Sequence, residues 1–463
     1  MTIERSSGEA SRPRTGPIDL VLRGGRVVDP AQGIDAYLDV LIHDGAIVEM
    51  TPDACAVPSA QVLDVRGSLV VPGLIDLHTH TFYGISSYAV EPDRAGIRAG
   101  VTHINDMGST GAFTFMGFRH WVVPSATTDI TCFPNVIGFG LPENWGAVAV
   151  ESGPPALLAD QLIKVGEKFP TIIRGVKCHL EPGEFSWAGW GTIDAAVTAA
   201  TSLGVPIYCH LGNLFPTNPN VEAPDPDKML AMSLERLRPG DLIGHVLSGH
   251  GGALIREDGS LNPAAREIPA SGCLTEVGYG VTTTFAASRI ILDAGIVPDI
   301  ISSDLHVTTP GRATGVFDHG SVLSYSLVGT MTKMLALGVP LSPVIAGATS
   351  NPARVLNLHD RKGTLRSGVA ADITILDQRS GSWELHDNAG EVLTTDTVLV
   401  PTRTIKNGRI FELDAMALPE FRQEYVASGI RSSYLTMATP LSACARVKRR
   451  HGTDDVSKRS WGA

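Results

Sequence analysis

The chain has 463 residues, of which 43% are hydrophobic and 18% charged, with 49 glycines and a formal net charge of −11. This composition is typical of a globular α/β protein and excludes a fibrous or largely disordered chain. The acidic balance argues against a nucleic-acid partner. No apolar run is long enough to span a membrane, and the polar residues 1–16 lack the apolar core of a secretory signal. We therefore expect a cytoplasmic protein with a disordered leader at 1–16.

The six cysteines are scattered along the chain and form no CxxC pair. Three of them fall within apolar, strand-like runs. The sequence therefore indicates buried free thiols in a reducing compartment rather than disulfides.

Both ends of the chain are rich in short β-type runs. Residues 19–29 predict two runs around a Gly-Gly turn, residues 37–49 a hairpin turning at Asp44-Gly45, and residues 62–67 a further strand. Similar runs return at 363–377, 396–400 and 403–411. We expect one small β-sandwich domain built from residues 17–68 and 359–415. Residues 416–463 are expected to be a partly disordered extension that carries a basic tail.

Between these ends, apolar runs alternate with stretches of helical spacing, which is the βαβ pattern of a parallel sheet. The expected strands lie at 70–80, 100–107, 128–138, 172–180, 205–210, 242–247, 274–277 and 299–304. The expected helices lie at 156–169, 192–203, 225–238, 282–294, 324–337 and 342–356. Eight such units predict a (β/α)8 barrel, a TIM barrel, over residues 69–358. A doubly wound open sheet fits less well, because no Gly-rich phosphate loop follows the first strand.

The first barrel run ends in His78-Thr-His80. Alternate residues of a strand point to the same side, so both imidazoles can bind one metal ion. The alternative is a strand that happens to end in two surface histidines.

Several other runs also carry an ionisable residue at or near the end where barrel enzymes hold their active sites. Each has an ordinary explanation by itself, such as a core histidine, a strand-end lysine or a turn-capping aspartate. Together at one rim they would be costly to bury, and a pair of divalent ions removes that cost. The sequence therefore predicts a ligand set of His78, His80, Lys177, His210, His245 and Asp304.

Lys177 needs its own chemical account, because a protonated amine cannot bind a metal. The apolar run around it favours loss of the proton. The neutral amine can then react with carbon dioxide to give a carbamate, whose two oxygens can bridge two metal ions. Glu181, four residues further on, is the alternative bridging carboxylate.

These features resemble the amidohydrolase superfamily over residues 18–411. The resemblance rests on the HxH pair after Val71-Pro-Gly-Leu-Ile-Asp76, the strand lysine, the later histidines, the final aspartate and the split β domain. Stretches at 100–109, 117–119, 303–306 and 350–354 are similar to the amidohydrolase/deacetylase branch, which is close to dihydroorotases and hydantoinases.

The resemblance implies a binuclear metal hydrolase that cleaves an amide or activated ester of a small molecule. It implies that His78 and His80 bind one metal, that His210 and His245 bind the other, and that carboxylated Lys177 bridges them. A metal-bridging hydroxide would attack the carbonyl, with Asp304 as general base and then acid. Zinc is the default metal for such ligands, and manganese, iron or nickel are alternatives. We also expect a homo-oligomer.

Two departures affect the substrate. Dihydroorotase-like enzymes carry an arginine two residues after the HxH pair, where this chain has Phe82, and Tyr279 replaces a histidine that deacetylase relatives tend to carry. Aromatic residues here would suit an apolar substrate group. Residues that could line the pocket, for most of which loop packing is an equal explanation, are Phe82, Tyr83, Asn144, Trp145, His179, Asn213, His250, Tyr279, His306 and Arg312.

Three alternatives stay open. A cyclic-amide hydrolase of the hydantoinase, imidase or dihydroorotase type uses a similar site. A deaminase usually needs one metal, which would leave Lys177 without a role. A catalytically silent barrel scaffold would have no need for six ligand residues at one rim.

Overall fold

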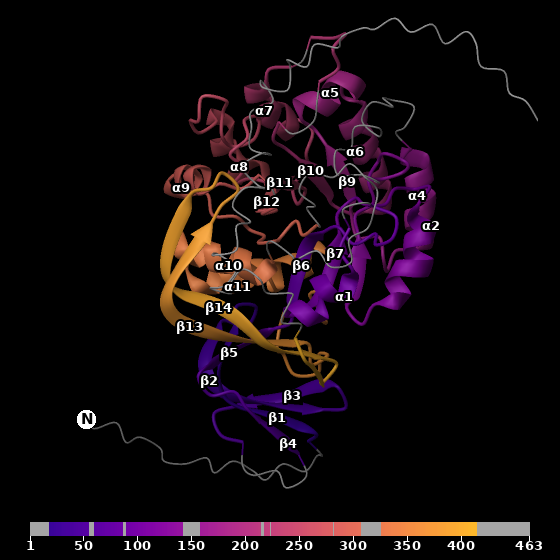
Figure 1. Cartoon of the computed structure of the whole chain (residues 1–463). Helices are drawn as coiled ribbons and strands as arrows, with labels where there is room; N and C mark the ends of the chain where they lie inside the picture. Colours follow the sequence, from indigo (N-terminus) through magenta and orange to yellow (C-terminus); the bar gives the residue numbers. More distant parts are fainter. Residues whose placement is uncertain are drawn as a thin grey trace, which may run out of the picture.

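The computed structural model describes residues 18–54, 60–86, 89–141, 158–213, 217–222, 224–280, 282–306 and 326–413. The leader predicted at 1–16 and the extension predicted at 416–463 lie outside these ranges. The described chain contains one large mixed sheet and two parallel sheets (Figure 1).

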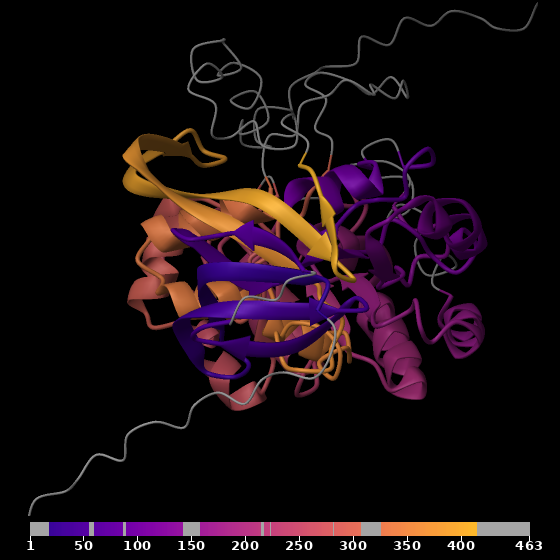
Figure 2. The same cartoon turned by 90° about the horizontal axis from the view of Figure 1, so that it is seen from below.

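Strands from both ends of the chain share the mixed sheet, which runs in the order β15-β14-β13-β5-β1-β2-β3, with β4 paired to β1. Figure 2 shows the indigo N-terminal strands beside the orange and yellow C-terminal strands. The strands are β1 Leu20–Asp29, β2 Ile34–His43, β3 Ala46–Thr51, β4 Gln61–Asp64, β5 Ser68–Pro72, β13 Ile373–His386, β14 Val392–Lys406 and β15 Arg409–Phe411. We call this the composite sheet. A sandwich of two sheets stays a prediction.

The turns of the composite sheet test two local predictions. The hairpin turn at Asp44-Gly45 is confirmed, since both residues have the positive φ of a type I′ turn (47° and 72°). The turn predicted at Gly24-Gly25 is wrong, because β1 runs through it without a break. The pairing of β1 with β2 shifts register between Leu22 and Gly25, and Gly24 has a φ of 72°, so the glycines form a bulge.

The middle of the chain forms parallel strands, as the βαβ pattern predicts. One sheet is β6-β7-β8 and the other is β9-β10-β11-β12. Their bounds are β6 Leu74–Thr79, β7 Val101–Asp106, β8 Asp129–Cys132, β9 Val176–His179, β10 Ile207–His210, β11 Leu242–Gly244 and β12 Leu274–Thr275. β5 belongs to the composite sheet, so the parallel strands begin at Leu74, a few residues after the predicted boundary at 69.

Isolated parallel bridges connect these sheets. Cys132 pairs with Ile173 and Asn135 with Lys177, which joins the runs that contain β8 and β9. The expected eighth run, 299–304, is not a regular strand, but Glu276 pairs with Ile300 and Thr79 with Leu305 at its two sides. The bridges connect the two parallel sheets on both sides, and a closed eight-stranded barrel stays a prediction.

Helices lie outside the parallel strands (Figure 1). They are α1 Pro92–Ala95, α2 Phe115–Gly117, α4 Ala159–Lys168, α5 Pro182–Ala188, α6 Gly191–Leu203, α7 Met229–Leu234, α8 Ile268–Ser271, α9 Phe285–Asp293, α10 Leu327–Ala336, α11 Leu341–Gly347 and α12 Ser350–Val355. The helix predicted at 342–356 is in fact two helices, since Thr349 leaves helical geometry between them (ψ −84°). The first one begins after Pro340 rather than at Ser342.

The side chains of the strands alternate between an inner and an outer core. On β10, Tyr208 packs inside with Leu242 and Ile300, whereas Cys209 packs outside against the helices. The four described cysteines are free and buried. Within the described ranges, no helix is long and apolar enough to cross a membrane.

Candidate active site

The carboxyl ends of the parallel strands bring the predicted ligand residues together. His78 at the end of β6 and His80 just after it both approach Asp304 at the end of the eighth run. Each Nε2 atom lies 3.1 Å from the same oxygen, Oδ1, of Asp304. All three side chains are at least nine-tenths buried. The strand period therefore does place both imidazoles on one side, facing the aspartate.

His245 completes a group that could hold a metal ion. Ligand atoms of His78, His245 and Asp304 all lie within 4.8 Å of one another. His245 and Asp304 both have a positive φ, of 57° and 50°, which is uncommon for residues with a side chain. Such backbone conformations concentrate at functional sites, where the surrounding structure enforces them.

The other predicted ligands lie beside this group. The ring centre of His210 is 4.2 Å from that of His245 and 4.8 Å from that of His179. The side chain of Lys177 is buried, and its Nζ lies 4.1 Å from the centre of the Tyr208 ring. Glu181 is buried at the N-terminus of α5, and its place as the alternative bridging group stays a prediction.

Glu276 and Tyr208 support the ligands and were not assigned from the sequence. Glu276 lies just after β12, fully buried, with Oε1 3.2 Å from His78 Nδ1. The Tyr208 hydroxyl donates to Glu276 Oε2 at 2.7 Å and lies 3.0 Å from the same His78 nitrogen. Ser302 also donates to Glu276. The sequence offered two signals for them. Glu276 is an acidic residue inside an apolar run, and Tyr208 lies two residues before a predicted ligand on the same strand.

Hydrogen bonds also orient the other imidazoles. His245 Nδ1 donates to the carbonyl of Gly278 at 2.9 Å, which leaves Nε2 as its ligating atom. His80 Nδ1 lies 2.9 Å from Ser109 Oγ, and the Ser109 amide donates to Asp106. Ligating histidines typically have such partners on the second ring nitrogen.

Burial and charge set the protonation of the site. Burial lowers the pKa of His80 to about 3 and that of His245 to about 4, so both imidazoles are neutral. Burial alone would raise the pKa of Asp304, but His78 and His80 outweigh it and hold that pKa well below its usual value. Burial also lowers the pKa of His78, but Asp304 and Glu276 reverse this and raise it to about 9.

These protonation states fit a divalent cation. Neutral imidazoles and an ionised carboxylate are metal ligands, and the raised pKa of His78 shows that the two carboxylates around it favour a positive charge there. Burial lowers the pKa of Lys177 to about 8, so a larger fraction of this amine is neutral, as carboxylation requires. The donor set therefore fits the predicted metal centre.

The residues predicted to contact substrate fall into two groups. His306 and His179 lie beside the ligands, since the His306 ring centre is 5.9 Å from that of His80. Phe82 is instead 3% exposed and packs edge-to-face on Phe118 in the hydrophobic core. The Tyr279 hydroxyl donates to the backbone oxygen of His386 in β13. These contacts favour the packing explanation for Phe82 and Tyr279, and a contact of either residue with substrate stays a prediction.

The remaining candidates stay predictions. His250 Nδ1 lies 3.3 Å from the carbonyl of Asn213, so these two are neighbours on adjacent loops. Tyr83 is half-buried after β6. Asn144, Trp145 and Arg312 lie outside the described residues.

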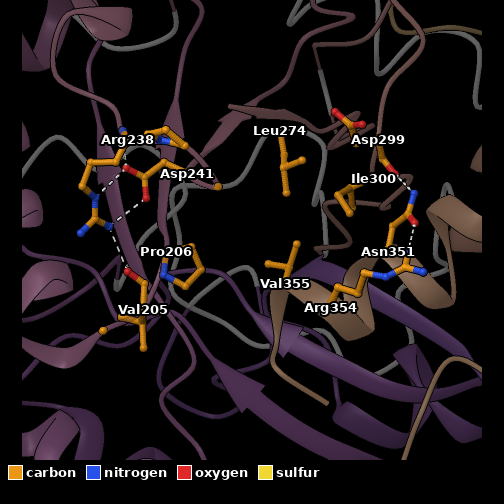
Figure 3. A pocket seen from close by; sticks show the side chains of 13 residues that line it. Val205, Pro206, Arg238, Asp241, Leu274, Asp299, Ile300, Asn351, Arg354 and Val355 are labelled. Carbon is orange, nitrogen blue, oxygen red and sulfur yellow. Dashed lines mark hydrogen bonds and ion pairs between the residues drawn. The ribbon is translucent and has the colours of Figure 1, made fainter. Parts of the chain in front are cut away.

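A cavity of about 610 Å³ lies at the opposite end of the same strands (Figure 3). Arg238 and Asp241 form one wall, joined at 2.8 Å, and Asp299 with Asn351 forms the other. Pro206, Leu274 and Val355 lie between them. Asn351 donates to the backbone carbonyl of Asp299, whose carboxylate accepts from Thr275, and none of these residues belongs to the ligand set.

Comparison with known proteins gives a consistent result. The model of the amidohydrolase family matches residues 69–411. A deacetylase of Brucella anthropi is 27% identical over 85% of this chain and 92% of its own length, and a deacetylase of Agrobacterium fabrum is 28% identical over 84% and 90%. The crystal structure of a dihydroorotase has a TM-score of 0.70 at 24% identity, over 85% of this chain and 99% of that one. The chain therefore belongs to the amidohydrolase family and is a hydrolase of carbon–nitrogen bonds other than peptide bonds.

Proposed function

We propose that the chain is a (β/α)8-barrel deacetylase that uses two divalent metal ions to remove an acyl group from a small molecule. The observation that carries this proposal is the convergence of His78, His245 and Asp304 within 4.8 Å at the carboxyl ends of parallel strands. The two deacetylase relatives, each similar over more than four-fifths of this chain, support the deacetylase assignment.

The residues divide between metal binding and proton transfer. In the proposal, His78 and His80 hold one ion, His210 and His245 hold the other, and Lys177 bridges them as a carbamate. To form the carbamate, the neutral Nζ attacks carbon dioxide, an N–C bond forms, and the amine loses a proton. Divalent ions bound there would lower the pKa of a coordinated water and polarise the scissile carbonyl.

In the proposal, Asp304 is the group that transfers the proton. Its carboxylate is ionised at neutral pH, because the imidazoles around it hold its pKa well below the usual value. Asp304 would accept a proton from the attacking water and pass it to the leaving nitrogen or oxygen. The positive φ of Asp304 and its contacts with His78 and His80 support this role.

A cyclic-amide hydrolase is the second candidate. Dihydroorotases are 24–26% identical over about four-fifths of the chain. Two residues after His80 this chain has Phe82, which lies in the core, where dihydroorotase-like enzymes carry an arginine. This difference counts against a dihydroorotase activity.

A hydrolysis screen tests the proposal. Metal-loaded protein would be assayed with N-acyl amino acids, acetylated hydroxy acids and cyclic imides. We expect turnover of acyl substrates, lost on chelation and restored by zinc or manganese. Turnover confined to cyclic imides would favour the second candidate. Mass spectrometry at neutral pH tests the acid-labile carbamate, and an unmodified Lys177 in metal-loaded protein would move the bridging role to Glu181.

A further inference from the structure

The hairpin β13–β14 extends far beyond the composite sheet. β13 pairs with β5 only as far as Asp377, and within the described ranges residues 378–399 pair only with each other. We call residues 378–399 the arm. Figure 1 shows it in orange, running from the composite sheet along the side of the parallel strands to α9. The arm thus links a distant part of the fold to the carboxyl ends of the strands.

Packing fixes the arm to the helices beside it. Leu385 and Val398 of the arm form a buried cluster with Phe285 at the start of α9. The amide of Leu399 donates to Thr332 of α10 at 3.1 Å. The arm is therefore held against α9 and α10 over much of its length.

The tip of the arm bonds to one short stretch of chain, residues 279–289. Asp387 Oδ2 accepts the amide of Phe285 at 2.7 Å, and Asn388 Nδ2 donates to the carbonyl of Thr283 at 3.0 Å. The Tyr279 hydroxyl donates to the His386 carbonyl at 3.1 Å. The tip therefore fastens the chain directly after the loop 276–280.

That loop shapes the candidate metal centre. Tyr279 lies between Gly278 and Gly280, whose φ values are 46° and 39°, in the left-handed region that favours glycine. The Gly278 carbonyl accepts the Nδ1 proton of His245, and a Cβ at Gly280 would overlap the Asp304 carboxylate. A small rotation of this loop would move the Gly278 carbonyl, which accepts the hydrogen bond from His245.

We propose that the arm braces the metal centre through Tyr279. The arm holds the Tyr279 hydroxyl, and Lys333 Nζ lies 3.9 Å from the centre of its ring. Together these contacts fix the Gly278 carbonyl, which sets the orientation and tautomer of His245. Tyr279 is then a positioning residue rather than a substrate contact. This inference rests on the metal centre proposed above.

The test compares two single-hydroxyl deletions in the full-length protein. Tyr279→Phe removes the bond to the arm and keeps the ring under Lys333. Tyr37→Phe, on β2 with 69% of the residue exposed, is the matched control. Both variants and the wild type would be loaded with cobalt(II). The measurements are the visible spectrum of the bound cobalt, its rate of release to a chelator, the unfolding midpoint, and kcat and KM.

We expect Tyr279→Phe to change the cobalt spectrum, to release metal about tenfold faster, and to lower kcat with KM nearly unchanged. Loss of a group that supports a ligating histidine typically lowers metal affinity or activity about tenfold or more. Asn388→Ala, which cuts another bond of the tip, should shift the same readouts in the same direction. An unchanged spectrum and release rate in Tyr279→Phe would overturn the inference. A raised KM with the spectrum unchanged would also overturn it and would return Tyr279 to the substrate pocket. Wild type that binds no cobalt would instead refute the metal centre itself.

Discussion

The charged side chains at the two ends of the parallel strands are arranged differently. At the amino ends, Asp241 accepts the Ile207 amide and three bonds from Arg238 (Figure 3). At the carboxyl ends, His78, His245 and Asp304 converge in a buried group. β11, which follows Asp241, leads to His245, and β12 leads to Glu276, which contacts His78. One set of strands therefore carries a closed ion pair at one end and an open ligand set at the other.

This difference separates stability from chemistry. A buried carboxylate that is fully paired with a guanidinium and an amide strengthens the fold. At the carboxyl ends, the ionised Asp304 is surrounded by neutral His80 and His245 and by His78, whose pKa is raised to about 9. His245 and Asp304 also have strained backbone, so we expect this group to contribute more to function than to stability. Substitutions at the carboxyl ends should therefore affect turnover, and those at the amino ends should affect folding.

Replacing Asp304 with asparagine should have the largest effect. The amide of asparagine keeps the shape of the carboxylate but cannot accept a proton, so kcat should fall by about a thousandfold or more. Steady-state kinetics with the best acyl substrate would measure this, alongside metal analysis, which should find metal still bound. A variant retaining a tenth of wild-type kcat would remove Asp304 from the proton transfer.

Glu276→Gln should have the next largest effect. The amide retains the acceptor for Tyr208 but removes the charge that faces His78 Nδ1. Activity and metal affinity should fall about 10–100-fold. The surface variant Glu267→Gln serves as the control, and equal activity of the two variants would show that Glu276 only packs.

Asp241→Asn, at the amino ends, should lower stability and leave kcat unchanged. The substitution removes the buried charge of Asp241, which pairs with the partly exposed Arg238 and accepts the Ile207 amide, so the free energy of unfolding should fall by about 1–3 kcal/mol. Urea unfolding would measure this, and kcat of the folded variant should match the wild type. A large loss of kcat without loss of stability would break the distinction between the two ends.

The smallest expected effect is a loss of stability at low pH. Asp129, which begins β8, contacts Lys362 at 2.7 Å and Lys406 at 2.6 Å. Burial would raise the pKa of Asp129, but the two ammonium groups outweigh it and lower the pKa to about 2, from 3.8 in the unfolded chain. The stabilisation is therefore present above about pH 4 and is lost as the pH falls towards about 2.

Unfolding midpoints of the wild type and Asp129→Asn across this range would test the effect. The wild type should be more stable at about pH 6, and the difference should vanish near about pH 2. A difference that stays constant with pH would show that the carboxylate charge of Asp129 contributes nothing.

The sequence was most informative where chemistry follows strand period. His78, His80 and Asp304 were predictable because each ends an apolar run, and parallel runs bring their carboxyl ends to one rim. Glu276 was missed because only its contacts with His78 and Tyr208, which are distant in sequence, give it a role.

Conformations imposed by tertiary structure could not be predicted from the sequence either. The left-handed backbone of His245 and Asp304 goes against their intrinsic preference and is enforced by their neighbours. Of the arm, only residues 396–399 were predicted as strand, because its exposed distal half lacks a clear apolar alternation. Tyr279 follows a strand end, like a substrate residue, yet its hydroxyl bonds to a strand more than a hundred residues away.

Metal analysis of the purified, folded protein tests the central claim most directly. The ligand set at the carboxyl ends predicts close to two divalent ions per chain, removed by chelation together with activity and restored with it. A folded protein that hydrolyses its acyl substrate at full rate with no bound metal would contradict the account.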